Sequence, residues 1–240
     1  MIICDSTHPR AYDSWILYTE EFYRDVQKRL LPGGVFAQWV PVLGSMRGDL
    51  FRIHLNTFRR VFPNSTLWYV YGSDQAFLLA TPKLLSLNAE RLQQQLNRLP
   101  KWFRAEEYQI DTVARIAGFF WLDELTMAKM VGPETRMNRD NLHYFDKQSA
   151  VWPLAPQWQL PQFQASVLPY LEQKKDALAP AIRDEQVVAQ LLAWYGFFRR
   201  KNELFRAYCL MPKNGNVQYW MAREFSDKLP DYNTFCSIHR

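Results

Sequence analysis

Hydrophobic and polar positions alternate along the first eighty residues in a way that predicts strands and helices in turn. Apolar runs at 1–4 and 35–40 are typical of buried strands, and residues 18–30 between them carry apolar side chains at helical spacing. Thr19 is the candidate N-cap of this helix, and Pro32-Gly33-Gly34 ends it. The pattern predicts two parallel strands joined by a helix, because parallel strands need such a crossover.

The same alternation continues to residue 80. Residues 49–62 have a wide apolar face and predict a second helix, which Pro63 ends. Apolar runs at 65–71 and 75–80 are separated by Gly72-Ser73-Asp74, and this spacing predicts an antiparallel hairpin. The near-continuous apolar character of the early strands indicates that both faces of their sheet are covered.

Helices dominate the prediction beyond residue 80. Residues 84–99 and 101–131 are expected to be helical, and Trp102 is expected to be buried. From residue 151 onward, prolines break up a stretch rich in Trp and Gln, which we interpret as a linker. Three further helices are expected at 166–178, 183–199 and 201–209. We therefore expect an α/β domain over residues 1–150 and a linker with a small helical region over residues 151–240.

Composition narrows the classes of function. The chain has 240 residues, 48% of them hydrophobic, which is enough for a substantial core. Its formal charge of +5 is spread along the chain without a basic block interleaved with aromatic residues, so we expect no nucleic-acid partner. No apolar run approaches the roughly 18 residues of a membrane span, and no signal peptide is visible. We expect this chain to be cytoplasmic.

Cysteine and histidine usage points to neither a disulfide framework nor a metal site. Cys4, Cys209 and Cys236 are few, odd in number and without metal-type spacing, which favours a reducing compartment over a disulfide scaffold. The four histidines are far apart and form no metal-binding pair. They are His8, His54, His143 and His239. The sequence therefore predicts no metal.

Asp5 is the first residue to suspect of chemistry. It directly follows the apolar run at 1–4, and the carboxyl end of a strand in a β-α-β unit faces the ligand crevice. The alternative is a turn or capping role, because Asp, Ser and Thr side chains often bond to their own backbone. The chain also opens directly inside a strand, which is the appearance of a cut chain.

Several segments together resemble one family. They are Asp5-Ser6-Thr7-His8-Pro9, Leu17-Tyr18-Thr19-Glu20-Glu21-Phe22-Tyr23, Leu31-Pro32-Gly33-Gly34-Val35-Phe36, Thr57-Phe58-Arg59-Arg60-Val61-Phe62-Pro63 and Met137-Asn138-Arg139-Asp140-Asn141. This series resembles the spermidine synthase (polyamine aminopropyltransferase) family over about residues 1–146. The last segment is similar to the "N-T-D" stretch of a membrane-associated, spermidine-synthase-like branch, so the parent protein is expected to be membrane-associated.

The resemblance implies roles for residues near Asp5. In that family the acid at this position is the general base on the attacking amine, and hydroxyl residues follow it, as Ser6 and Thr7 do here. Position 8 is His8 where the family has a second acid that helps to hold the diamine, and this weakens the case for a diamine substrate. By the resemblance, Ser6, Thr7 and His8 are candidates for binding the substrate in its pocket. Tyr18 and Gln38 are candidates for lining the polyamine pocket, with purely structural roles as the alternative.

The resemblance also implies what this chain lacks. The family binds decarboxylated S-adenosylmethionine as co-substrate through a Gly-rich loop after its first strand, and no Gly-x-Gly-x-x-Gly occurs in this sequence. The expected fold is therefore a partial methyltransferase-like (Rossmann-like) doubly wound α/β sheet without its first strands. We expect the carboxyl-terminal part of an aminopropyltransferase, inactive alone and binding no co-substrate alone. The rival hypotheses are a non-catalytic module with a protein partner and, ranked lower, a methyltransferase.

Overall fold

The chain forms two compact units in a computed structural model. Unit 1 comprises Met1–Leu85 and Trp121–Ala177, and unit 2 comprises Ser86–Phe120 and Leu178–Arg240. The structure describes residues 1–5, 14–41, 48–69, 75–103, 110, 112–142, 144, 184–189, 191–192, 195, 201–225 and 236. The domain boundary expected at residue 150, the linker after it and the helix expected at 166–178 lie outside these residues and stay predictions.

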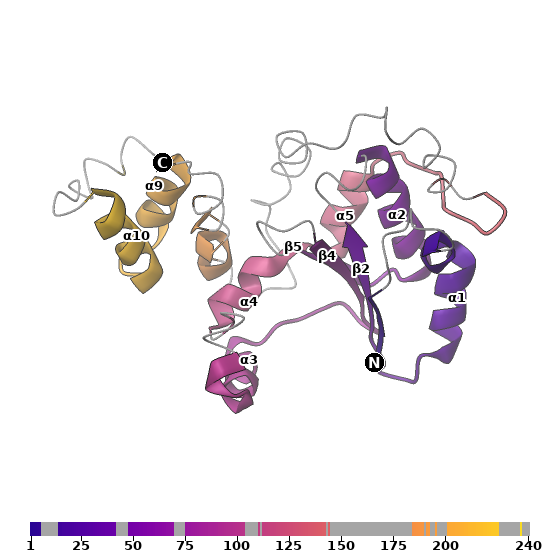
Figure 1. The fold of residues 1–240 in the computed structure, drawn as a ribbon, viewed down its shortest axis with the longest axis horizontal. Coiled ribbons are helices and arrows are strands. Elements are labelled where there is room, and N and C mark those ends of the chain that lie inside the picture. The colour runs from indigo at the N-terminus through magenta and orange to yellow at the C-terminus, as the bar shows by residue number, and fades with distance from the viewer. Residues whose placement is uncertain are drawn as a thin grey trace. The chain divides into compact units, whose positions relative to one another are not determined.

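A five-stranded mixed sheet in the order β1-β2-β4-β3-β5 is the centre of the α/β architecture (Figure 1). Its strands are β1 (Ile2–Cys4), β2 (Phe36–Pro41), β3 (Ser65–Tyr69), β4 (Gln75–Ala80) and β5 (Phe120–Leu122). The parallel pairing of β1 with β2 and the antiparallel β3–β4 hairpin are both confirmed. The sequence did not predict that β4 also pairs antiparallel with β2 and so lies between β2 and β3.

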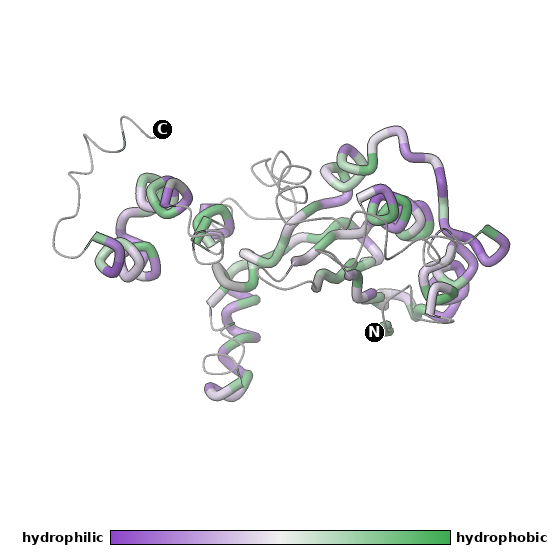
Figure 2. The backbone as a smooth tube through the Cα atoms, turned by 45° about the horizontal axis from the view of Figure 1, so that its top comes forward, coloured by the Kyte–Doolittle hydropathy of each residue, from purple (hydrophilic) through white to green (hydrophobic). Residues whose placement is uncertain are grey.

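Three helices of unit 1 lie on one face of this sheet: α1 (Glu20–Arg29), α2 (Gly48–Val61) and α5 (Glu124–Val131) (Figure 1). The expected start of α1 is confirmed, because Thr19 Oγ1 accepts a hydrogen bond from the Phe22 amide at 3.3 Å. Most of α1 is hydrophilic, drawn purple in Figure 2, and it turns only a few side chains, among them Tyr23 and Val26, inward.

An aromatic cluster joins these helices to the sheet. Phe36 of β2 stacks on Phe58 of α2 with ring centroids 5.7 Å apart, and Tyr23 of α1 meets Phe58 edge-on at 5.1 Å. Phe62 lies 5.5 Å from Phe36 and completes the cluster. All four side chains are at least 94% buried, so this cluster is the part of the core that fixes α1 and α2 above β2.

The opposite face of the sheet is less covered than the sequence predicted. Trp68 of β3 and Phe77 of β4 stack there at 6.1 Å, but Ile3 of β1 remains 63% exposed. The expectation that both faces are covered is therefore wrong at β1. The physical reason is that β1 is the edge strand, with a neighbour on one side only.

The sequence predicted helix throughout residues 101–131. The structure instead has α4 (Val113–Phe119), the strand β5 and α5 in this region. The Phe120-Trp121-Leu122 run is fully buried and extended, as suits aromatic side chains beside β3. Asp123 then starts α5, because its Oδ1 accepts the Thr126 amide hydrogen bond at 2.8 Å. Trp102, expected to be buried, is 56% exposed.

The described part of unit 2 is helical. The helix expected from residue 84 is α3 (Ala89–Arg98), which begins later because Asn88 caps it by accepting from the Arg91 amide at 2.8 Å. The helices expected near 183–199 and 201–209 correspond to the helical residues 184–189 and to α9 (Lys201–Leu210). The structure adds α10 (Gly215–Phe225), whose Glu224 accepts a hydrogen bond from Tyr195 and pairs with Lys201 at 3.2 Å.

A disulfide joins Cys209 of α9 to Cys236, which corrects the expectation that the cysteines stay unpaired. Cys209 and Cys236 are both buried. Cys4 takes part in no disulfide. Counting cysteines misled the prediction because an odd total conceals a pair whose members are 27 residues apart in sequence. Disulfides persist in oxidising environments, so the inference of a reducing compartment loses its support.

We expect Cys209→Ser to lower the free energy of unfolding of unit 2 by about 3 kcal/mol, because the disulfide restricts the unfolded chain over a loop of this length. Urea unfolding followed by circular dichroism measures the change. A reductant should destabilise the wild-type protein and Cys4→Ala alike and leave Cys209→Ser unchanged. An equal response of Cys209→Ser to reductant would contradict the pairing.

Candidate functional site

Asp5 directly follows the carboxyl end of β1, beside the parallel strand β2, which continues to Pro41. Cys4 is in register with Gln38, so Asp5 follows one position beyond this pair. The carboxyl ends of parallel strands form the ligand-binding edge of open α/β sheets. Asp5 is exposed and makes no hydrogen bond or ion pair with the described part of the chain. Its carboxylate is therefore available to a ligand but is not shielded from water by the described residues.

Gln38 lies within β2, opposite Cys4, and is fully buried. It shares the helix-covered face with Phe36 and Val40, since alternate residues of β2 are buried there. Its Nε2 donates to the Trp39 carbonyl at 3.3 Å, whereas its Oε1 has no hydrogen-bond partner among the described residues. A buried carbonyl oxygen without a partner is uncommon and marks an acceptor that a bound donor would satisfy.

Tyr18 closes the short 3-10 helix η1 (Ser14–Tyr18) and is also fully buried. Its ring lies 5.2 Å from the ring of His54 of α2, and Tyr23 lies 6.4 Å from His54 on another side. Burial lowers the pKa of His54 to about 3, so its imidazole is neutral at physiological pH. Burial, with smaller contributions from Tyr18 and Cys4, raises the pKa of Tyr23 well above its ordinary value.

The buried His54 makes stability depend on pH in a definite direction. The unfolded chain protonates His54 below about pH 6.5, whereas the folded chain keeps it neutral down to about pH 3. Protons therefore favour the unfolded state, and stability falls as the pH falls through this window. We expect His54 to cost about 2 kcal/mol of unfolding free energy between pH 6.5 and pH 5. Urea unfolding of the wild type and His54→Leu at both pH values checks this, because the variant should lose less.

Asn138 is a buried residue near this edge whose role the sequence did not reveal. Its backbone amide donates to Thr57 Oγ1 at 2.9 Å, and its carbonyl accepts from the Glu20 amide at 2.9 Å. Its side-chain Nδ2 donates to the Tyr18 carbonyl at 3.1 Å, and its Oδ1 accepts from the Tyr144 amide at 2.9 Å. One residue thus ties η1 and the start of α1 to α2.

Charged side chains reinforce the same junction. Glu20, whose side chain is only 11% exposed, pairs with Arg139 at 3.0 Å and with Arg24 at 2.5 Å. The Asp140 amide donates to Glu21 Oε2 at 3.2 Å. The segment that resembled the "N-T-D" stretch therefore binds the first turn of α1, where acidic side chains also favour the positive end of the helix.

The predicted site residues have different environments. Asp5 is exposed at the strand ends, whereas Tyr18 and Gln38 are both buried beneath the helices. No hydrogen bond joins these three side chains to one another in the described part of the chain. The remaining predicted residues, Ser6, Thr7 and His8, lie outside the described residues, so their pocket roles stay predictions.

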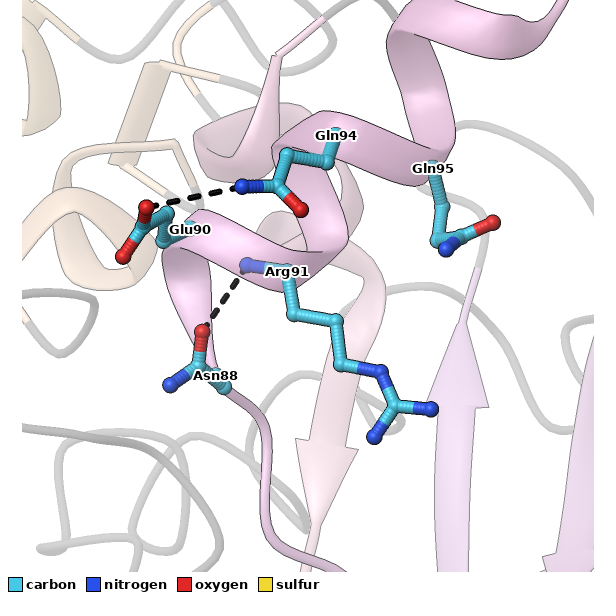
Figure 3. A pocket seen from close by; sticks show the side chains of 5 residues that line it. All are labelled: Asn88, Glu90, Arg91, Gln94 and Gln95. Carbon is cyan, nitrogen blue, oxygen red and sulfur yellow. Dashed lines mark hydrogen bonds between the residues drawn. The ribbon is translucent and has the colours of Figure 1, made fainter.

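Asp5 lines neither of two hollows in the described surface. One of about 480 Å³ is lined by polar side chains of α3 and its cap, and Figure 3 shows these side chains along a single helix. Asn88 caps the Arg91 amide there, and Gln94 donates to Glu90 at 3.4 Å, so much of their bonding capacity is already used. The described residues contain no group of three or more His, Cys, Asp or Glu that could hold a metal ion.

Comparison of the chain with family models, with curated proteins and with solved structures gave no match. The helices within the described residues are all too short or too polar to cross a membrane.

Proposed function

We propose that this chain is the carboxyl-terminal part of a spermidine-synthase-like aminopropyltransferase and that it supplies the general base, Asp5. The motif series of the sequence motivates the proposal. The observation that carries it is the position of Asp5 directly after the carboxyl end of β1, a strand that runs parallel to β2. In an open α/β sheet, ligands bind at the carboxyl ends of the parallel strands.

The strand order adds support. β1, β2 and β3 run in one direction, and β4 runs opposite to them and lies between β2 and β3. The resemblance implies strands 4 to 7 of a methyltransferase-like sheet, and a reversed last strand inserted between two parallel strands suits that part of such a sheet. The exposed edge of β1 is then where the preceding strands would pair.

The proposed aminopropyl transfer needs hydrogen-bond acceptors near the attacking amine. Aminopropyl transfer forms a bond from an amine nitrogen to the carbon beside the sulfonium of the co-substrate, while the bond from that carbon to sulfur breaks and a neutral thioether leaves. The amine must also lose a proton, which Asp5 would accept. A carboxylate is a much weaker base than an alkylamine in water, so it serves only when placed against the proton and shielded from solvent. The unsatisfied Oε1 of Gln38, the β2 residue opposite Cys4, is a second acceptor and suits an N–H donor such as a polyamine.

The residues of this chain do not fit the co-substrate by themselves. Decarboxylated S-adenosylmethionine carries a ribose and a sulfonium, and the sequence has no Gly-rich loop to approach them closely. The exposure of Asp5 likewise means that another segment must exclude water from it. We infer that the amino-terminal half of the complete protein would hold the co-substrate and that this chain alone is inactive.

Calorimetric titration with decarboxylated S-adenosylmethionine tests the division of the site. The isolated chain should give no binding at micromolar concentrations, and the chain joined to its amino-terminal half should bind. Micromolar binding to the isolated chain would show that the half-site proposal is wrong. Sequencing the DNA upstream of the first codon should reveal a frame that encodes the Gly-rich loop.

A second candidate function is a non-catalytic interaction module. The specific observation is the edge strand β1, where Met1 is 79% and Ile3 63% exposed, because an exposed apolar strand edge invites pairing with another chain. Size-exclusion chromatography with light scattering discriminates. A well-folded monomer that stays monomeric at high concentration would count against an obligatory protein partner.

A further inference from the structure

A second hollow, of about 450 Å³, lies in unit 1 between α2, the end of α5 and the segment after α5. Arg52, Val131, Pro133, Glu134, Thr135 and Arg136 line it. Its volume is within the range of small-molecule sites. None of Asp5, Tyr18 and Gln38 contributes to it, so what it binds does not depend on the proposed transferase function.

Arg136 is held rigidly in this hollow. Its Nε and Nη2 donate to the two carboxylate oxygens of Glu134 at 2.8 and 2.6 Å, and its backbone amide donates to the same carboxylate at 2.9 Å. These hydrogen bonds are the largest cause of the lowered pKa of Glu134. The Arg136 carbonyl accepts from Asn56 at 3.0 Å, and the guanidinium lies 5.8 Å from the Tyr144 ring. The side chain is therefore fixed before any ligand arrives.

Arg52 provides the free cation. It is exposed on α2 and makes no ion pair or hydrogen bond with the described residues, although its charge helps to lower the pKa of Glu134. A guanidinium presents a planar set of donors that matches phosphate and carboxylate oxygens. Thr135 also lines the hollow, and its hydroxyl is a third possible donor beside the two arginines.

The carboxylates near the hollow limit which anions it can accept. Glu134 engages Arg136 with both oxygens, and the charge of Asp49 raises the pKa of Arg136. The charges of the two arginines are thus balanced by those of Glu134 and Asp49, and the hollow carries no large excess of positive charge. A ligand must therefore reach the donors of Arg52, Thr135 and Arg136 directly, and a phosphate group has enough acceptor oxygens to bond to all three.

We propose that this hollow binds the phosphate group of a small soluble molecule, with Arg52 as its main anchor and with Arg136 and Thr135 as supporting donors. Glu134 acts by holding Arg136 in place. Arg52 is the residue to change in a test, because its exposed side chain makes no hydrogen bond or ion pair with the described residues.

The test is a calorimetric titration of the whole chain with inorganic phosphate, at ionic strength kept constant with chloride. We expect saturable binding with a dissociation constant of about 1 mM, weakened at least about tenfold in Arg52→Gln. Arg60→Gln is the matched control, because Arg60 is exposed on the same helix and does not line the hollow. It should bind phosphate as the wild type does, and circular dichroism should show both variants folded.

Three outcomes would overturn the proposal. They are a wild-type chain without saturable phosphate binding, equal weakening in Arg52→Gln and Arg60→Gln, and binding to vesicles that contain phosphatidic acid without binding to inorganic phosphate. The last result would assign the arginines to a lipid surface rather than to a small molecule. Binding of inorganic phosphate that depends on Arg52 and not on Arg60 would support it.

Discussion

Replacing Asn138 by alanine should destabilise unit 1 by about 3 kcal/mol, since it removes one buried and one partly buried hydrogen bond to the backbone. The Tyr18 carbonyl would lose the Asn138 Nδ2 donor, and the Tyr144 amide would lose the Oδ1 acceptor. The side chain is fully buried, so water cannot replace these bonds without opening the junction. Urea unfolding at neutral pH measures the loss.

Asn141→Ala is the matched control for this variant. Asn141 is three residues away, exposed, and makes no hydrogen bond within the described part of the chain, so its removal should change stability by less than about 0.5 kcal/mol. Equal stabilities for the two variants would mean that Asn138 does not hold η1 and α1 against α2. A large loss in Asn138→Ala alone would assign the motif residue a structural role.

Asp5→Asn should reduce the rate of aminopropyl transfer by at least about 100-fold when the chain is joined to its amino-terminal half, because the amide cannot accept the amine proton. Asparagine keeps the shape of the side chain, so the apparent affinity for the polyamine should change much less than the turnover number. Steady-state kinetics with varied polyamine concentration separates these two effects. The exposed position of Asp5 makes a folding defect an unlikely cause of lost activity, and circular dichroism checks this.

Asp25→Asn serves as the control for the loss of a negative charge. Asp25 is an exposed residue of α1 that pairs with Lys28 at 3.2 Å, on the part of the helix away from its first turn. It should keep full activity. If Asp25→Asn and Asp5→Asn lower the rate equally, Asp5 is not the base, and the interaction-module hypothesis gains ground.

Features encoded by neighbouring residues could be predicted from the sequence. The cap at Thr19, the acidic first turn and the basic last turn of α1 all lie within twelve residues, and the structure confirms them. The β3–β4 hairpin is similarly local. The position of Asp5 after a parallel strand also followed, because the crossover helix forces β1 and β2 to run the same way.

Features that depend on distant residues could not be predicted. Asn138 bonds to groups 120 and 81 positions earlier in the chain, and no spacing rule connects them. The resemblance singled out the segment but not its contacts. The burial of Gln38 likewise depends on helices α1 and α2, which cover only one face of β2. The strand β5 was missed because a three-residue aromatic run inside a long apolar stretch is compatible with a buried helix.

The placement of β4 has a consequence for how the chain can acquire its shape. β2 and β3 are not paired with each other. Each pairs with β4, which follows both of them in the sequence. In a growing polypeptide that stops before residue 75, β1 and β2 can pair with each other, but β3 has no partner among the strands already present. The β3–β4 hairpin forms faster than pairings between distant segments, so β3 joins the β1–β2 pair only after β4 has been made.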